Sequence, residues 1–197
     1  MASHGLTSLE TYEDFCAKAA SAVAASGERR PVQWNDVYKN FGKVAANAVV
    51  EVWTPASDVA AAIASGYDVI AAPIGAWYLS QTGYSVATFY EYDPCSSLDA
   101  DACAKVLGVE AALWGEKVDA SDLDSTMWPR AAAFAERAWS ANGDVVGEVN
   151  GTFTNFTEWR LQNFRCELDE RGVYSESVKP RFARVAPSHP GSCLRQR

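Results

Sequence analysis

VLGVEAALWGEKVDASDLDSTMWPRAAAFAERAWS, residues 106–140, is the stretch that decides the fold. It opens with an apolar run, 106–113, that has the length and composition of a strand buried on both faces. A tryptophan, a glycine and a glutamate follow at 114–116, and after a polar loop residues 128–139 predict an alanine-rich helix. Strand, loop and helix in this order make one βα unit of a parallel α/β fold, in which functional groups lie at the carboxyl ends of the strands.

The rest of the chain repeats this plan. Apolar runs that predict strands lie at 32–34, 48–53 and 67–73, and segments that predict helices lie at 7–26, 55–65, 100–105 and 154–171. Strand-like runs that alternate with helices predict a parallel sheet. The first helix has a capping box, Thr7 with Glu10, and an apolar stripe that is expected to face the core. The stripe consists of Leu9, Tyr12, Phe15, Cys16, Ala19, Ala20 and Val23.

The composition is that of a globular protein with an acidic surface. Hydrophobic residues make up 48% of the chain, charged residues 21%, and the formal net charge is −8. This charge argues against nucleic acid and anionic membranes as partners. No apolar run approaches the roughly 20 residues that span a bilayer, and residues 1–8 have neither the basic nor the apolar region of a signal peptide.

The scarcity of histidine limits the possible chemistry. The two histidines, His4 and His189, lie in segments that read as tails, so a Ser-His-Asp, Cys-His or multi-histidine metal site is not expected. None of the five cysteines forms a C-x-x-C pair. We therefore expect no metal and no cofactor, and any chemistry must use carboxylates, tyrosines and groups of the substrate itself.

Aromatic residues recur where the predicted strands end. They are Trp34, Trp53, Trp77 with Tyr78, and Trp114. A single tryptophan at such a place is more often a core residue. Equivalent positions along the ligand-binding edge of a parallel sheet favour instead an aromatic-lined pocket for an apolar or sugar-like group.

Taken in order, these residues resemble the C-terminal half of the catalytic domain of family-20 glycoside hydrolases, the β-N-acetylhexosaminidases. The likeness runs from about residue 8 to residue 173, with order and approximate spacing kept. The matching segments are 32–38 (VQWNDVY), 50–53 (VEVW), 77–79 (WYL), 108–116 (GVEAALWGE), 128–131 (WPRA), 135–140 (AERAWS), 164–168 (FRCEL) and 171–173 (RGV).

The resemblance implies a partial (β/α)₈ TIM barrel, with strands five to eight and their helices but without the first half. It divides the chain into residues 1–148, the C-terminal half of the barrel, and residues 149–197, a closing helix and tail packed on the barrel. Four parallel strands without closure leave two bare edges. The chain is therefore expected to need the missing barrel half or to self-associate, whether it is a truncated gene product, a piece of a longer enzyme or one of two subunits.

The resemblance also implies roles for single residues. Trp34, Trp53 and Trp114 are expected to bind substrate as walls around the 2-acetamido methyl group and the sugar ring. Tyr78 is expected to be both substrate-binding and catalytic, because its hydroxyl would bond the acetamido carbonyl, and Glu116 is expected to bind sugar hydroxyls. In this family the substrate's own acetamide, in place of an enzyme carboxylate, attacks the anomeric carbon.

Two departures from the family pattern bear on activity. Ser80 stands where the family usually has an Asp or Asn that binds a sugar hydroxyl, and serine is too short for the same contact. The family's adjacent Asp-Glu pair, which orients the acetamide and supplies the general acid, has no counterpart in this chain. The two adjacent acidic pairs that are present, Glu13-Asp14 and Asp169-Glu170, read as surface charge.

The chain is thus expected to be a fragment of an exo-β-N-acetylhexosaminidase. The whole enzyme would remove terminal N-acetylglucosamine or N-acetylgalactosamine by substrate-assisted retaining catalysis, and the fragment alone is expected to be inactive. The alternative is a non-catalytic protein that binds N-acetyl sugars or serves as a scaffold. The expected partners are N-acetylhexosamine-containing glycans. The compartment of this chain stays open, and the resemblance implies a lysosomal or secreted location for a full-length relative.

Two glutamates, Glu51 and Glu110, lie inside the predicted strands. Glu110 and Glu116 share one strand face, but six residues place them roughly 20 Å apart, too far for the paired carboxylates of a glycosidase. Glu51 and Glu110 are therefore both expected to be buried structural carboxylates.

The cysteines allow two disulfides. The resemblance implies a Cys166–Cys193 bond between the last helix and the tail. Cys95 and Cys103 flank a short loop and could pair as well, which would leave Cys16 free. Five reduced thiols are the alternative.

Overall fold

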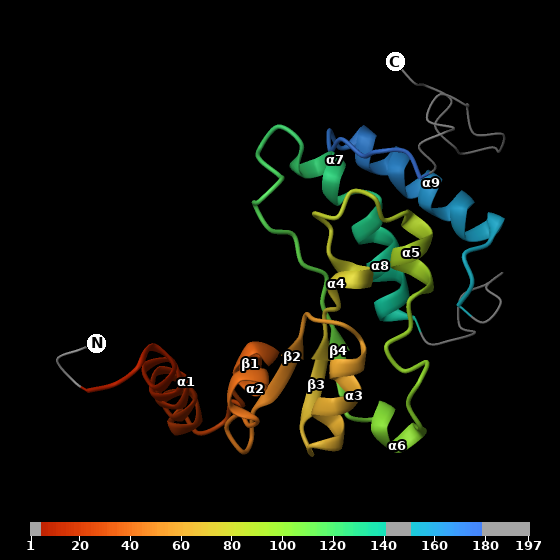
Figure 1. Cartoon of the computed structure of the whole chain (residues 1–197). Helices are drawn as coiled ribbons and strands as arrows, with labels where there is room; N and C mark the ends of the chain where they lie inside the picture. Colours follow the sequence, from red (N-terminus) through yellow and green to blue (C-terminus); the bar gives the residue numbers. More distant parts are fainter. Residues whose placement is uncertain (1–4, 141–150, 179–197) are drawn as a thin grey trace. The chain divides into compact units, whose positions relative to one another are not determined.

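A computed structural model describes residues 5–140 and 151–178 of the chain (Figure 1). The chain forms two compact units, each of which is described by itself. Unit 1 comprises Met1–Gly75 and Pro94–Glu110, and unit 2 comprises Ala76–Asp93 and Ala111–Arg197. The predicted domain boundary at residue 148 lies outside the described residues.

Unit 1 is built on a four-stranded parallel sheet in the order β1-β2-β3-β4. The strands are β1 (Val32–Trp34), β2 (Val49–Val52), β3 (Asp68–Ala71) and β4 (Val106–Val109). Each lies within a predicted run, so the prediction of an α/β fold with a parallel sheet is confirmed. The core is densest at the two central strands, where Val50, Val52 and Val69 are fully buried.

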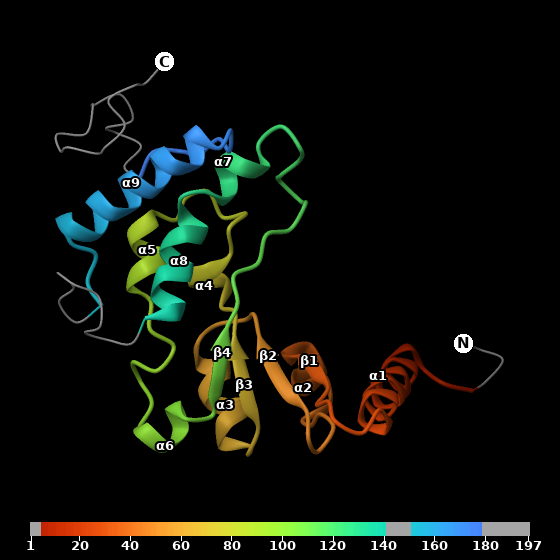
Figure 2. The ribbon, with the colours of Figure 1, turned by 180° about the vertical axis from the view of Figure 1, so that it is seen from behind.

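Among the described residues, four helices lie wholly in unit 1. They are α1 (Ser8–Ala25), α2 (Asn35–Phe41), α3 (Ser57–Ala64) and α6 (Ala100–Cys103), and α1 lies beside α2 at the β1 end of the sheet (Figures 1 and 2). The capping box of Thr7 and Glu10 is present as predicted. Gly27 follows α1 with φ of 92°, a left-handed conformation that glycine adopts without strain.

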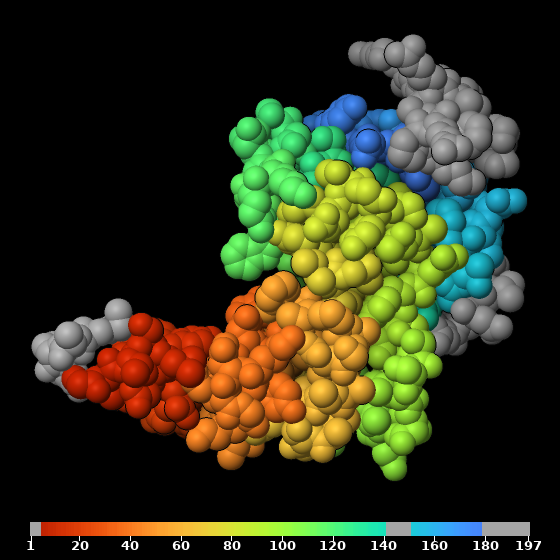
Figure 3. Space-filling view, in the orientation of Figure 1, coloured from red at the N-terminus to blue at the C-terminus, as the bar shows by residue number. Residues whose placement is uncertain are grey.

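The predicted apolar stripe of α1 is only partly buried. Cys16 and Ala20 are buried, but Leu9, Phe15 and Val23 are exposed, Phe15 to 69%. The reason is that α1 meets the rest of the unit along a narrow line, chiefly at α2, where Tyr12 packs against Phe41 with ring centroids 5.4 Å apart. Figure 3 shows α1, in red, at the margin of unit 1.

Unit 2 is helical. Its elements are α4 (Ile74–Trp77), which begins in unit 1, then α5 (Val86–Glu91), α7 (Leu123–Met127), α8 (Arg130–Trp139) and α9 (Asn155–Glu170), and α5 packs against α8. No helix was predicted over the segment that forms α5, and α7 lies in the stretch predicted to be a polar loop, so the sequence missed both helices. Within the described part of the chain, no helix combines the length and the apolarity needed to cross a membrane.

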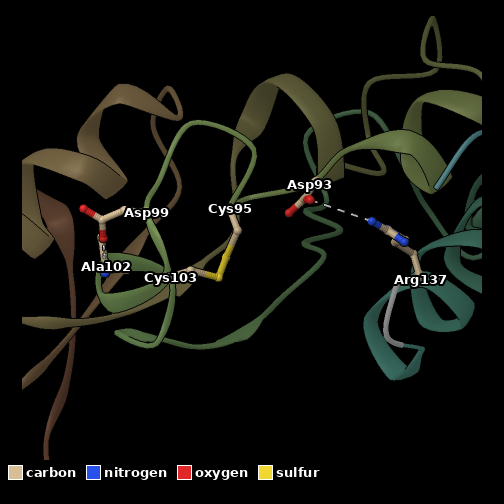
Figure 4. Close-up of a disulfide and its surroundings, with 6 residues drawn as sticks. All are labelled: Asp93, Cys95, Asp99, Ala102, Cys103 and Arg137. Atoms are coloured by element: carbon tan, nitrogen blue, oxygen red, sulfur yellow. Dashed lines mark hydrogen bonds and ion pairs between the residues drawn. A yellow bond between two sulfur atoms is a disulfide. The ribbon is translucent and has the colours of Figure 1, made fainter. Parts of the chain in front are cut away.

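Of the two alternatives that the sequence left open for Cys95 and Cys103, the structure has the disulfide, in unit 1 (Figure 4). It ties the segment before α6 to the end of that helix, whose start is capped by Asp99 through a 2.8 Å hydrogen bond from the Ala102 amide. Cys16 is free and buried. Cys193 lies outside the described residues, so the Cys166–Cys193 bond stays a prediction.

Replacing both Cys95 and Cys103 with serine is expected to destabilise unit 1 by about 2–3 kcal/mol, because the unfolded chain regains the freedom of a short closed loop. Hydrogen exchange of the β3 and β4 amides measures the loss. Reduction with dithiothreitol should cause the same loss of stability in the wild-type protein. It should not change the hydrogen exchange of these amides in the double variant. Equal protection in the oxidised and reduced wild-type protein would contradict the prediction.

Candidate functional site

Two of the predicted tryptophans lie at the carboxyl ends of neighbouring strands in unit 1. Trp34 is the last residue of β1, and Trp53 follows β2 directly. The strand register pairs Trp34 with Glu51, which places Trp53 two residues further along the adjacent strand. Trp34 is partly exposed and Trp53 is 38% exposed, so both rings are available to a ligand.

An acidic residue on α2 orients Trp53. The Trp53 indole N–H donates to Asp36 Oδ2 over 2.6 Å. The residue before Asp36 and the residue after Trp53 are also bonded, since Asn35 Nδ2 donates to Thr54 Oγ1. Sequence reasoning missed Asp36, although its place two residues after a predicted strand end was a usable signal.

Glu51 is buried as predicted, but Glu110 is exposed, contrary to the prediction. Glu110 follows β4, which is the last strand of the described sheet and so has a neighbouring strand on one side only. Burial and the neighbouring Glu110 carboxyl, to which Glu51 is also hydrogen-bonded, raise the pKa of Glu51 to about 7. Near neutral pH Glu51 is therefore partly protonated, which supports the structural role assigned to it.

In unit 2, Tyr78 and Glu116 meet. The Tyr78 hydroxyl lies 2.6 Å from Oε1 and 2.7 Å from Oε2 of Glu116, so it donates to a carboxylate at the short distance typical of charge-assisted bonds. Partial burial and the Glu116 carboxylate raise the pKa of Tyr78, and the hydrogen bond from Tyr78 lowers the pKa of Glu116. The sequence named both residues but did not predict that they bind each other.

Ser80 and Trp114 tie the same two segments together. The Ser80 hydroxyl accepts a hydrogen bond from the Trp114 amide over 3.1 Å and donates to the Trp114 carbonyl over 2.9 Å. Beside this pair, the Leu79 amide donates to the Ala112 carbonyl over 2.8 Å. Ser80 is buried, whereas the Trp114 side chain is 57% exposed. The serine is therefore fully used within the protein, and the indole that it positions faces solvent.

Arg130, at the start of α8, forms hydrogen bonds to the backbone just after Tyr78. Its guanidinium donates to the carbonyls of Leu79 (2.7 Å), Gln81 (2.9 Å) and Thr126 (2.5 Å). It also lies 5.4 Å from the centroid of the Phe89 ring. Arg130 thus fixes the backbone on both sides of Ser80.

Trp77 is not part of any exposed aromatic surface, which corrects its grouping with the other strand-end aromatics. It is 1% exposed, its indole N–H donates to the Phe89 carbonyl over 3.0 Å, and its ring packs edge-on against Tyr92 and Phe134. A tryptophan in the short helix α4 points into the core of unit 2, while the next residue, Tyr78, stays partly exposed.

The adjacent acidic pairs have the surface positions that the sequence predicts. Glu13 forms a salt bridge with Lys43 (3.4 Å), and Asp14 pairs with Lys18 (2.7 Å). Asp169 and Glu170 are exposed at the end of α9. Across the described ranges, no group of three or more His, Cys, Asp or Glu side chains is arranged to hold a metal ion.

The five predicted site residues therefore fall into two groups: Trp34 and Trp53 in unit 1, and Tyr78, Trp114 and Glu116 in unit 2. In each unit, aromatic rings that are at least partly exposed occur with a carboxylate that accepts a hydrogen bond from one of them, Asp36 in unit 1 and Glu116 in unit 2. Exposed aromatic rings beside hydrogen-bonding groups are typical of ligand-binding sites in α/β proteins.

Comparison with known proteins identifies the particular family. The family model described as "Glycosyl hydrolase family 20, catalytic domain" matches residues 1–142. The chain is 35% identical to beta-hexosaminidase 3 of Arabidopsis thaliana over 195 residues, which cover 98% of the chain and 35% of that protein. It is 30% identical to beta-hexosaminidase subunit alpha of Rattus norvegicus over 188 residues, 90% of the chain and 34% of that protein. The chain belongs to glycosyl hydrolase family 20, as its sequence indicated.

The fold is also that of solved family members. An exo β-N-acetylglucosaminidase of Vibrio harveyi superimposes with a TM-score of 0.72 at 23% identity, over 90% of this chain and 29% of that one. The chain spans about a third of the length of the curated relatives it matches.

Proposed function

We propose that this chain is part of an exo-acting β-N-acetylhexosaminidase and supplies strands five to eight of its catalytic barrel. Trp34, Trp53 and Trp114 bind the acetamido methyl group and the sugar ring, Tyr78 bonds the acetamido carbonyl, and Glu116 binds sugar hydroxyls. These roles follow from the match to family motifs. Because the two groups of residues lie in different units, each group supports the proposal separately.

The observation that carries the proposal is the Tyr78–Glu116 pair beside the exposed Trp114 ring. A phenol hydroxyl, a carboxylate and an indole are the donor, the acceptor and the apolar surface that an N-acetyl sugar requires. Family membership supplies the reaction class, since the relatives are named as β-hexosaminidases.

The proposed reaction uses the substrate as its own nucleophile. The acetamido carbonyl oxygen bonds to the anomeric carbon, the glycosidic C–O bond breaks, and the leaving oxygen takes a proton from a general acid. Tyr78 positions the carbonyl oxygen and stabilises the charged cyclic intermediate, from which water releases the sugar with retained configuration. We assign the general acid to a part of the enzyme outside this chain, because the adjacent acidic pairs here are surface ion pairs or exposed helix ends.

Binding of a thiazoline analogue of the cyclic intermediate tests the site. Isothermal titration should detect binding to the wild-type chain, and Tyr78→Phe should weaken it roughly tenfold, the cost of one hydrogen bond to a charged group. Tyr84→Phe, a neighbouring tyrosine without a role in the proposal, is the matched control. An affinity that Tyr78→Phe leaves unchanged would contradict the role of Tyr78.

Hydrolysis of a substrate tests the proposal that the general acid lies outside this chain. The chain alone should leave a chromogenic N-acetylglucosaminide at the background rate, whereas a fusion to the preceding part of the Arabidopsis relative's catalytic domain should cleave it. Thiazoline binding without turnover by the fusion would support the alternative, a sugar-binding protein without catalysis. Failure of both measurements would overturn the proposal.

A further inference from the structure

We infer that Asn155 is a modification site, to which an N-linked oligosaccharide is attached before the helix α9 folds. The site is the sequence Asn155-Phe156-Thr157, an Asn-x-Thr acceptor whose middle residue is not proline. It lies at the start of α9. The site shares no residue with the proposed sugar site and does not depend on the proposed function.

The side chain of Asn155 is available for modification in the folded protein. Asn155 is the first residue of α9 and is exposed. Within the part of the chain that the structure describes, its side-chain amide forms no hydrogen bond. Phe156, the middle residue of the acceptor sequence, is also exposed, to 38%. An oligosaccharide on the Asn155 nitrogen would therefore displace no internal contact and would extend into solvent.

The start of α9 does not need the Asn155 side chain. The helix is capped by Thr154, whose hydroxyl accepts from the Thr157 amide over 3.3 Å, while Thr157 Oγ1 accepts from the Thr154 amide over 3.4 Å. This reciprocal cap supplies partners for amides that a helix start leaves without any. Attachment of a sugar replaces one N–H of an uncharged amide, so the charge at the helix start does not change. The folded helix thus tolerates the modification.

Thr157 determines when the oligosaccharide is attached. It is 1% exposed, and its hydroxyl lies 3.2 Å from Thr154 Oγ1 within the cap. An enzyme that recognises Asn-x-Thr must reach the threonine as well as the asparagine. The folded helix presents Asn155 but hides Thr157. Attachment therefore takes place on the unfolded chain, and α9 forms afterwards with the threonine inside and the oligosaccharide outside.

The disulfide between Cys95 and Cys103 supports the same history independently. Structural disulfides form and persist in oxidising compartments, such as the lumen of the endoplasmic reticulum, and are rare where thiols are kept reduced. In eukaryotic cells the same lumen contains the oligosaccharyltransferase that modifies Asn-x-Thr sequences. A chain that acquires this disulfide there is exposed to that enzyme before it folds.

The chemical step is a glycosyl transfer from an oligosaccharide linked to a lipid pyrophosphate. Asn155 Nδ2 forms a bond to the anomeric carbon of the reducing-end sugar, the bond between that carbon and the pyrophosphate oxygen breaks, and the lipid pyrophosphate leaves. One proton of the amide passes to a base of the transferase. No group is oxidised or reduced.

Mass spectrometry of the protein isolated from the cells that make it tests the site. The tryptic peptide 138–160 contains Asn155 and a second acceptor sequence at Asn150, which lies outside the described residues. Peptide-N-glycosidase A in water enriched in heavy oxygen converts a glycosylated asparagine to heavy aspartate, and fragment ions between the two positions show which one was modified. The peptide without glycosidase controls for spontaneous deamidation. We expect heavy aspartate at position 155, and an unmodified asparagine there overturns the inference.

Transfer by a purified oligosaccharyltransferase tests the order of events. The synthetic peptide 138–160 and the folded full chain are compared, both with Asn150→Gln so that this second acceptor is absent. The peptide should be modified at least roughly tenfold faster, because only the locally unfolded fraction of α9 exposes Thr157. Asn155→Gln should abolish transfer to the peptide and leave the circular dichroism of the full chain unchanged. Thr157→Ser keeps a hydroxyl for both the acceptor and the cap, so the difference between peptide and folded chain should persist.

The results separate the two parts of the inference. Equal rates for the peptide and the folded chain overturn the order of events, since the buried hydroxyl of Thr157 would then be no obstacle. Transfer that Asn155→Gln leaves intact, or a peptide that accepts no oligosaccharide, overturns the site itself.

Discussion

Arg130→Met is expected to destabilise unit 2 by about 3–5 kcal/mol, because it leaves three backbone carbonyls without their donor and removes a charge that the surrounding structure was built to hold. Arg130 is 5% exposed, and its partners are the carbonyls of Leu79, Gln81 and Thr126. Typical domains have a total stability of only about 5–15 kcal/mol. Much of the stability of unit 2 would therefore be lost with one side chain.

Two variants sharpen the Arg130 experiment. Arg130→Lys keeps the positive charge but cannot present the planar fork that reaches three carbonyls, so an intermediate loss is expected. Arg171→Met removes an exposed arginine at the end of α9, where the loss should stay within about 0.5 kcal/mol. Urea unfolding followed by near-ultraviolet circular dichroism measures all three. Equal midpoints for Arg130→Met and Arg171→Met would show that the buried guanidinium contributes nothing.

The strands could be predicted from the sequence because burial on both faces leaves a clear apolar run. The run 106–113 nevertheless overestimates β4, which ends at Val109. The composition stays apolar where the chain passes from unit 1 to unit 2, and Ala112 then makes only an isolated bridge to Tyr78. Apolar composition reports burial, and it does not report whether a neighbouring strand is present.

The helix α5 was missed because its residues, VATFYE, favour strands or loops by propensity. Its start was readable, since Ser85 caps it by accepting from the Thr88 amide over 3.2 Å. Its existence depends on packing against α8, where Phe89 and Tyr90 become fully buried. Tertiary packing of this kind outweighs weak local preference and cannot be seen in one segment alone.

The site residues could be named from the sequence, but their mutual contacts could not. Tyr78 and Glu116 were assigned to two different groups of a substrate, and nothing in the order of the chain indicated that they would bind each other. Ser80 was described by what it lacks relative to the family's acidic residue. Its actual role, two hydrogen bonds to the backbone of Trp114, depends on a bridge between segments 34 residues apart.

The second large effect concerns pH and the sheet of unit 1. Burial and Glu110 raise the pKa of Glu51 to about 7, above the ordinary value of 4.5 that applies in the unfolded chain. Between these values the folded protein binds a proton that the unfolded chain does not. The contribution of this proton to the unfolding free energy of unit 1 is therefore fully present below pH 4.5, falls as the pH rises to 7, and is lost above it. A shift of this size corresponds to a loss of about 3 kcal/mol.

Glu51→Gln should remove most of this pH dependence and make unit 1 more stable than the wild-type protein at pH 8, because a neutral amide replaces a carboxylate that is 8% exposed. At pH 4.5 the two proteins should be nearly equal. Glu110→Gln should give a smaller effect in the same direction, since it removes the neighbouring charge but leaves Glu51 buried. Glu28→Gln, an exposed position, should follow the wild-type curve.

Urea unfolding read from the amide signals of β2 and β3, repeated from pH 4.5 to pH 8, measures these curves for unit 1 alone. Glu51 lies two residues before Trp53 on a central strand, so its charge acts on the same strand that carries a proposed sugar-binding ring. Mild acid should consequently improve the order of Trp53, visible as a sharper indole N–H signal in the wild-type protein and unchanged with pH in Glu51→Gln. If the unfolding free energies of the wild-type protein and of Glu51→Gln change with pH in parallel, the pKa of Glu51 is the same in the folded sheet as in the unfolded chain. That result would contradict the prediction.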